Sequence, residues 1–331
     1  MKKLLPFLFA AITALILAAC TTTTTTPEKE VADNAIDVYT TVYPLQYFTD
    51  RIGAEYVNVK SIYPTGANEH SFEPTQKAMI DLADADLFFY IGLGLEGFVE
   101  KAEKTLKDEN VQFVPTANAL TAEQLAISTG HVHTEDEAHD HGHDHDHEGE
   151  EEAHENEEID AHVWLSPVLS KELATAIKNQ LIATMPEHEA YFTQNYETLV
   201  QELDTLNTEF EQMAANVKNK TFFVSHAAFG YIAGHYGFTQ VPIAGLNSQS
   251  EPSQKELAQI VDLAKEKNIK DVFFEQNVSS NLASVIQDEI GAEARTLHNL
   301  SVLTEEDVKN NKDYFSLMRD NLESLEEALN K

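Results

Sequence analysis

The sequence Glu73-Pro74-Thr75-Gln76-Lys77 recurs in the second half of the chain as Glu251-Pro252-Ser253-Gln254-Lys255. Each copy is expected to open a helix, because a Thr or Ser before the first helical residue accepts hydrogen bonds from otherwise free N–H groups. Glu256 strengthens the second case, since it completes a capping box with Ser253. A match of five residues alone could be shared capping chemistry, so the surrounding elements decide what it means.

The elements around the two copies also repeat in order. Before each copy come a β-branched or aromatic strand, a helical pattern that stops at a glycine, and a second strand; after each copy the helix leads to an apolar strand. These elements span 37–41, 45–52, 56–63 and 86–90 in the first half, and 221–225, 229–236, 238–243 and 271–274 in the second. The repeat predicts an α/β fold of two related lobes, each with a parallel sheet, right-handed crossovers and flanking helices.

A long amphipathic segment lies between the two halves. From Pro186 onward, apolar residues recur every three to five positions, and no Gly or Pro interrupts the pattern before Lys220. This spacing predicts one long helix, at 186–218, that joins the lobes. A coiled-coil dimer seam is the alternative; it is less favoured because the stripe covers few turns and lacks regular flanking charge pairs, so we expect a monomer. The predicted lobes are 36–185 and 219–331.

The N-terminus has the pattern of an export signal. Two lysines precede a short apolar run, and small residues lead to Cys20, the single cysteine of the chain. Leu17-Ala18-Ala19-Cys20 resembles the lipobox of bacterial lipoproteins. We therefore expect a signal peptide at 1–19, a lipid on Cys20, and a flexible tether over 20–35 that holds an extracytoplasmic protein at a bacterial membrane. One cysteine allows no disulfide within a single copy.

The segment 131–158 is acidic and rich in histidine. It holds eight of the 14 histidines, with almost no apolar residue that could build a core. Imidazole is a common ligand for zinc and similar ions, so we expect an auxiliary, solvated metal-binding loop. The histidines expected to bind there are His139, His141, His143, His145 and His147. The alternative is a polar linker whose histidines are incidental.

The net charge of −34 argues against nucleic acid as a partner and suits a cation as ligand. Candidate ligands for a primary site are His70, His162, His226 and Glu275, all placed in predicted loops or at strand ends. Open α/β sheets bind their ligands at the carboxyl ends of strands. Each of these residues, taken singly, could have a purely structural role. Their shared position at loops and strand ends favours one common metal site. Three imidazoles and one carboxylate would form a closed tetrahedral shell that suits Zn²⁺ and leaves no position for catalytic water.

Four segments of the sequence resemble the metal-site motifs of zinc-specific substrate-binding lipoproteins of bacterial ABC importers (the ZnuA/AdcA type, solute-binding protein family 9). The segments are Asn68 to Thr75, Asp160 to Pro167, Ser225 to Tyr231 and Phe273 to Glu275. The resemblance covers nearly the whole chain beyond the signal, including the His-rich segment. It implies a zinc ion between two lobes joined by a long helix, held by His70, His162, His226 and Glu275, and delivered to an ABC permease.

The resemblance also carries alternatives. Some zinc-binding members complete the shell with water or with the glutamate beside the first histidine, here Glu69. Manganese-binding relatives generally have an acidic residue where His226 stands, which favours zinc here. The chain ends soon after the second lobe, so we expect no further C-terminal zinc-binding domain. A surface adhesin, a role reported for relatives, is the second hypothesis for the function. A metallohydrolase is the third, and the sequence contains no HExxH motif that would support it.

Overall fold

The structure is a computed structural model that describes residues 32, 34–129, 159–247, 252–276 and 280–331. The predicted signal peptide, Cys20, most of the tether and the His-rich segment 131–158 lie outside the described residues. Among the residues that are described, none of the helices has the length and apolar character needed to cross a bilayer.

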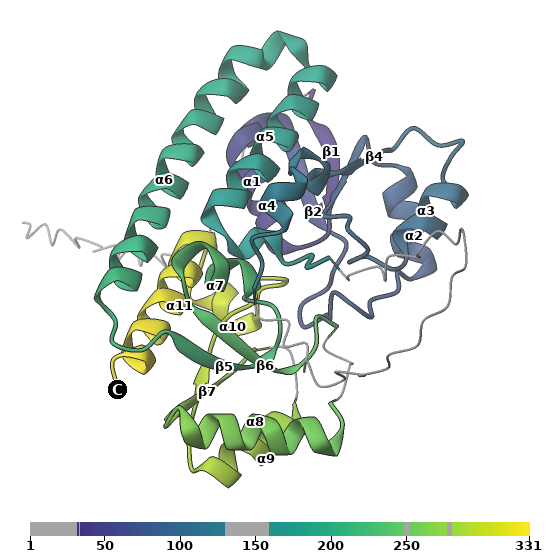
Figure 1. The fold of residues 1–331 in the computed structure, drawn as a ribbon. Helices are drawn as coiled ribbons and strands as arrows, with labels where there is room; N and C mark the ends of the chain where they lie inside the picture. The colour runs from purple at the N-terminus through teal and green to yellow at the C-terminus, as the bar shows by residue number, and fades with distance from the viewer. Residues whose placement is uncertain (1–31, 33, 130–158, 248–251, 277–279) are drawn as a thin grey trace, which may run out of the picture. The chain divides into compact units, whose positions relative to one another are not determined.

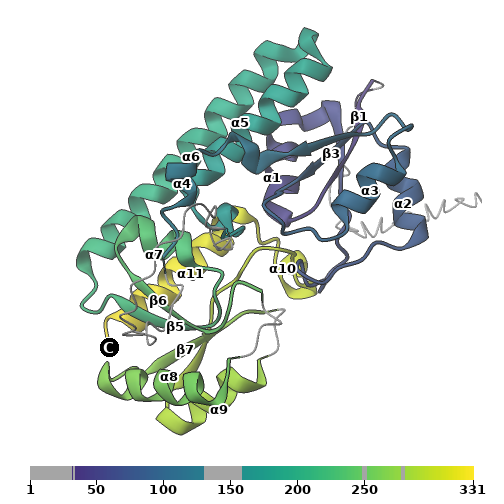
Figure 2. The same ribbon diagram turned by 45° about the vertical axis from the view of Figure 1, so that its right-hand side comes forward.

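The first half of the chain forms a four-stranded parallel sheet with strand order β2-β1-β3-β4 (Figure 1). Helix α1 packs on strands β1 and β2, while α2 and α3 lie together on the other side of the sheet (Figure 2). The strands are β1 (Ile36–Thr40), β2 (Val57–Ser61), β3 (Leu87–Tyr90) and β4 (Gln112–Pro115), and the helices are α1 (Tyr43–Gly53), α2 (Gln76–Ala83), α3 (Val99–Thr105) and the short α4 (Ala122–Leu125).

The second half repeats this arrangement with strand order β6-β5-β7-β8, again all parallel. Helices α8 and α9 pack together along one side of the sheet, and α7 and α11 contact its strands as well (Figure 1). The strands are β5 (Thr221–His226), β6 (Thr239–Ala244), β7 (Asp271–Phe274) and β8 (Glu293–Thr296), and the helices are α7 (Gly230–Tyr236), α8 (Gln254–Glu266), α9 (Asn281–Ile290), α10 (Glu305–Lys309) and α11 (Tyr314–Leu329). The predicted repeat is therefore confirmed, and so is the α/β fold class.

The two copies of the repeated sequence act as predicted at the starts of α2 and α8. The Thr75 hydroxyl accepts a hydrogen bond from the backbone N–H of Ala78 at 3.1 Å. Ser253 and Glu256 form a reciprocal capping box, with distances of 2.7 and 3.3 Å. Such a cap contributes about 1 kcal/mol to helix stability. The two copies of the repeated sequence therefore begin two equivalent helices with the same kind of N-cap.

The predicted linker is a short 3-10 turn, η4 (Pro186–His188), followed by the 28-residue helix α6 (Glu189–Asn216). Helix α6 runs beside α5 (Pro167–Thr184) over much of its length (Figure 1). Its apolar stripe is fully buried at Leu199, Leu203, Leu206 and Phe210. Because α5, α1 and α11 of the same chain cover the helix, the stripe is not an exposed seam.

The C-terminal helix α11 returns to the first half of the chain. The ring of Tyr314 packs edge-on against Phe48 of α1, with 4.9 Å between ring centroids. The Tyr314 hydroxyl donates to the carbonyl of Trp164 at 3.2 Å. No local pattern in the sequence predicts this contact, which joins the two halves through large, fully buried aromatic side chains.

Candidate metal centre

Three histidines from the two halves of the chain meet in one cluster. His70 lies in the turn between β2 and α2, His162 precedes the 3-10 turn η3 (Val163–Leu165), and His226 is the last residue of β5. One ring nitrogen from each lies within 4.8 Å of the other two. All three were candidate ligands in the sequence, and the structure brings them together although 156 positions separate the first from the last (226 − 70).

Two of the distances between candidate donor atoms match the edges of a tetrahedral metal shell. The Nε2 atoms of His70 and His162 lie 3.3 Å apart, and Nδ1 of His226 lies 3.0 Å from Oε1 of Glu275. Zinc bonds of about 2.0 Å imply tetrahedral edges of about 3.3 Å between ligand atoms. Glu275 follows β7 and touches the cluster through His226, but it is not one of the three residues whose donor atoms are all mutually close.

Asp160 fixes the orientation of His162. Its Oδ1 accepts the backbone N–H of His162 at 2.9 Å and lies 2.8 Å from the ring Nδ1. Because this oxygen acts as an acceptor, Nδ1 carries the proton and the lone pair of Nε2 points at His70. Carboxylates of this kind orient metal-binding imidazoles and make them more basic. Asp160 begins one of the four motifs but was not predicted to have a role; its place two residues before His162 was the available signal.

His226 is held between two acceptors. Its Nδ1 faces the Glu275 carboxylate, and its Nε2 lies 2.8 Å from the carbonyl oxygen of Leu246. Burial would lower the pKa of His226, but the charge and hydrogen bonds of these acceptors outweigh burial and raise the pKa to about 9. Burial and the two neighbouring imidazoles lower the pKa of His70 to about 3.

Glu69 is a second buried carboxylate at the edge of the cluster. Its Oε1 lies 4.0 Å from Nε2 of His70, and its Oε2 is buried without a hydrogen-bond partner among the described residues. Burial, together with the charge of Glu275, raises the pKa of Glu69. Asn299 donates from Nδ2 to both Glu69 and Glu275. No pattern in the sequence pointed to Asn299, because it lies in an irregular segment after β8.

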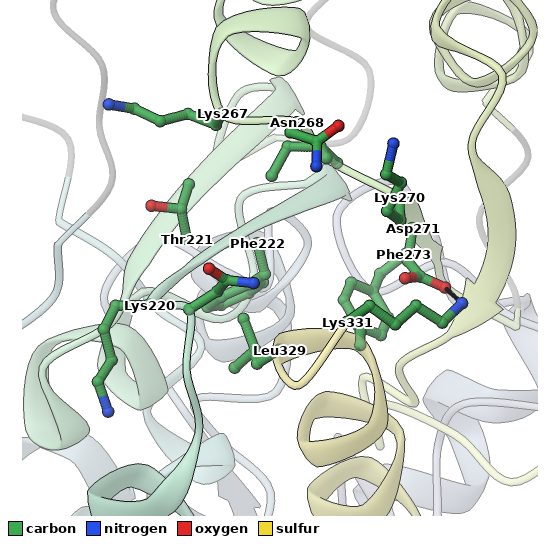
Figure 3. A pocket seen from close by; sticks show the side chains of 13 residues that line it. Lys220, Thr221, Phe222, Lys267, Asn268, Lys270, Asp271, Phe273, Leu329 and Lys331 are labelled. Carbon is green, nitrogen blue, oxygen red and sulfur yellow. Dashed lines mark hydrogen bonds and ion pairs between the residues drawn. The ribbon is translucent and has the colours of Figure 1, made fainter.

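A cavity of about 240 Å³ lies elsewhere in the described part of the chain, where β5 and β7 begin. Four lysines line it, but Figure 3 shows Lys220, Lys267 and Lys270 directed away from one another. The fourth, Lys331, pairs with Asp271 at 2.7 Å. The cavity therefore presents no converging donor atoms.

A family model described as "Zinc-uptake complex component A periplasmic" (ZnuA) matches residues 38–328. The chain belongs to the ZnuA family. One relative is the high-affinity zinc uptake system protein ZnuA of Bacillus subtilis. It is 33% identical over 328 residues, which cover 99% of this chain and 98% of that protein.

Two streptococcal proteins extend the comparison. The zinc-binding lipoprotein AdcA of Streptococcus pneumoniae is 34% identical over 99% of this chain, but the chain spans only 61% of AdcA. The crystal structure of the Zn(II)-bound ZnuA-like domain of AdcA matches with a TM-score of 0.71 at 30% identity, covering 90% of this chain and 100% of that domain. The laminin-binding protein Lmb of Streptococcus agalactiae, described as a bifunctional protein with adhesin and metal transporting activity, matches with a TM-score of 0.73 at 29% identity, covering 89% of this chain and 100% of Lmb.

Substituting Gly230 of this ZnuA-family chain with alanine should weaken metal binding without touching a ligand. A Cβ atom there would lie 2.1 Å from the Ser128 hydroxyl and 2.8 Å from Oδ2 of Asp160. Asp160 must then move, so His162 loses its support. We expect zinc affinity to fall about 10- to 100-fold, as for other residues that support a metal ligand. Zinc titration and thermal unfolding measure the effect.

Gly97→Ala is the matched control. A Cβ atom at Gly97 meets nothing within 4 Å among the described residues, and its backbone lies outside the left-handed region. This variant should keep both zinc affinity and stability. Wild-type affinity in Gly230→Ala would contradict the support that we assign to Asp160.

Proposed function

We propose that this protein is the extracytoplasmic zinc-binding component of an ABC importer, which captures Zn²⁺ and delivers it to a membrane permease. The observation that carries the proposal is the convergence of His70, His162 and His226, with ring nitrogens all within 4.8 Å, between two parallel sheets. Membership of the zinc-uptake family supports the same ion. The Zn²⁺ ion is the cargo of this site.

The proposed shell has three nitrogens and one oxygen, from His70, His162, His226 and Glu275. The 3.0 Å separation of Glu275 from His226 supports the carboxylate as fourth ligand. Glu69 is the alternative, because one of its oxygens is buried and free of hydrogen bonds among the described residues. This nitrogen-rich set favours zinc, since manganese prefers more oxygen donors and a higher coordination number.

The remaining parts of the proposal concern where the protein works. A lipid on Cys20 would hold it at the membrane surface beside the permease, as a monomer, with no role for nucleic acid. We propose no catalytic activity, because the family is that of a component of an uptake complex. Adhesion, an activity described for Lmb, is the secondary proposal and would act through a surface other than the buried histidine cluster.

A zinc titration of the full chain, with and without residues 131–154, tests the function. Metal-free full-length protein should bind one zinc tightly and several weakly, because a His-rich segment with few apolar residues must lose conformational entropy to enclose an ion. The deletion should remove the weak equivalents and keep the tight one. Just outside the deletion, Ser128 donates to Asp160 at 2.5 Å and Thr129 N–H donates to the Gly230 carbonyl at 3.1 Å, so both borders stay anchored.

Two outcomes of this titration would contradict different parts of the proposal. Full-length protein without a tight zinc equivalent would refute the proposed function. Loss of the tight equivalent on deletion would instead show that the His-rich segment belongs to the primary site.

A further inference from the structure

Asn299 lies between the two carboxylates that border the histidine cluster. Its Nδ2 donates to Oε1 of Glu69 at 3.1 Å and to Oε2 of Glu275 at 2.8 Å. Glu69 precedes α2 in the first half of the chain, and Glu275 follows β7 in the second. One fully buried amide therefore uses both of its N–H groups on carboxylates from opposite halves.

The orientation of this amide is fixed. Its Oδ1 accepts hydrogen bonds from Nε2 of Gln276 at 2.9 Å, from the Ser301 backbone N–H at 3.0 Å and from the Ser301 hydroxyl at 2.9 Å. The carbonyl of Asn299 accepts the indole N–H of Trp164 at 2.7 Å. Because the donors surround Oδ1, the amide cannot rotate by 180° without losing three hydrogen bonds. The NH₂ group is thus committed to Glu69 and Glu275.

The arrangement limits the oxygens that a metal can use. Each carboxylate has two oxygens, and each gives one of them to Asn299. Without Asn299, two neighbouring carboxylates could offer up to four oxygens, enough with three imidazoles for a shell of six or more ligands. With Asn299 in place, Oε2 of Glu275 and Oε1 of Glu69 are held toward the amide. The oxygens left for an ion are Oε1 of Glu275, beside the His226 ring, and Oε2 of Glu69.

We propose that Asn299 is a positioning residue that selects zinc over manganese by keeping one oxygen of Glu69 and one of Glu275 out of the metal shell. It does not itself bind the ion. This role rests on the proposed zinc-binding function and deepens it. The physical basis is that Zn²⁺ accepts four ligands, whereas Mn²⁺ gains from additional oxygen donors. A residue that withholds oxygens therefore favours zinc.

The test compares Zn²⁺ and Mn²⁺ binding by competition in the full chain with Asn299→Leu and Asn299→Ser. Leucine removes the amide at similar volume, and serine leaves a small polar side chain in case the leucine variant does not fold. Both should lower the zinc-to-manganese affinity ratio by about tenfold or more, the scale expected for residues that support a metal ligand. The visible spectrum of the Co²⁺-loaded protein should also change from an intense tetrahedral to a weaker, higher-coordinate form.

Two controls separate positioning from loss of structure. Asn321 clamps the same segment, through the backbone N–H and carbonyl of His298, and is equally buried but contacts neither carboxylate in the hydrogen bonds observed. Asn321→Leu should lower thermal stability and leave the affinity ratio and the Co²⁺ spectrum unchanged. Ser301→Ala, which removes one donor to Oδ1 and keeps the NH₂ group in place, should shift the ratio by less than about threefold.

The outcomes are distinct. Unchanged ratios and spectra in both Asn299 variants, in a protein whose wild type binds zinc tightly, would overturn the positioning role alone. An equal shift in Asn321→Leu would also overturn it, because the effect would then follow from the segment as a whole. A wild type without tight zinc binding would overturn the proposed function first.

Discussion

Replacing His226 with alanine should abolish tight zinc binding while the protein remains folded. The side chain supplies one of four proposed donors and is fully buried in the cluster. Removing a supporting residue around a metal already costs about 10- to 100-fold in affinity, so loss of a ligand itself should exceed about 100-fold. His162→Ala should have an effect of similar size. Calorimetric titration of metal-free protein measures both.

His188→Ala is the control for these substitutions. His188 lies in η4, where it stacks on Tyr56 with 3.7 Å between ring centroids. It is a histidine with substantial packing but no part in the cluster, so its loss should leave zinc affinity intact. A tight zinc equivalent that survives in either His226→Ala or His162→Ala would remove that residue from the proposed shell.

The residues proposed as ligands could be selected from the sequence because their positions follow from topology. Two copies of one strand-and-helix order place residues after strand ends at a common edge, and His226 and Glu275 stand at such ends. The support around them could not be predicted in the same way. Asn299 reaches Glu69 across 230 positions of sequence (299 − 69), and nothing local in the segment after β8 shows which carboxylate it will meet.

The same contrast holds for the fold. Strands β1 and β5 are apolar and β-branched, so their pattern predicted them to within a residue or two. Strand β8 reads Glu-Ala-Arg-Thr and is mostly exposed at the sheet edge, so it carries little periodic signal. Helix α11 is amphipathic, but its pattern alone does not reveal that Tyr314 packs against Phe48 of the first half. Local patterns predict elements, and long-range packing decides which of them meet.

The protonation of His226 couples zinc binding to pH. Both ring nitrogens of His226 face acceptors, the Glu275 carboxylate and the Leu246 carbonyl. Although burial opposes the charge, the Glu275 carboxylate and the hydrogen bonds raise the pKa of His226 to about 9. His70, with its pKa lowered to about 3 by burial and by the other imidazoles, carries no proton at neutral pH. Zinc must therefore displace a proton from His226 and none from His70.

Zinc affinity should accordingly fall by about tenfold for each pH unit below about 9, as a single competing proton requires. The stability of the metal-free protein should change in the opposite sense. Because the folded pKa of His226 lies above the value of about 6.5 for an unfolded chain, its contribution to the free energy of unfolding is complete below about pH 6.5. That contribution is lost as the pH rises through about 9.

Calorimetry in buffers of different ionisation enthalpy should detect about one proton released per zinc near pH 7, and thermal unfolding without metal should show the loss of stability. In Glu275→Gln the charge that raises the pKa is gone, so both trends should weaken above neutral pH. Zinc binding that releases no proton and does not vary with pH would show that His226 is neutral in the metal-free protein.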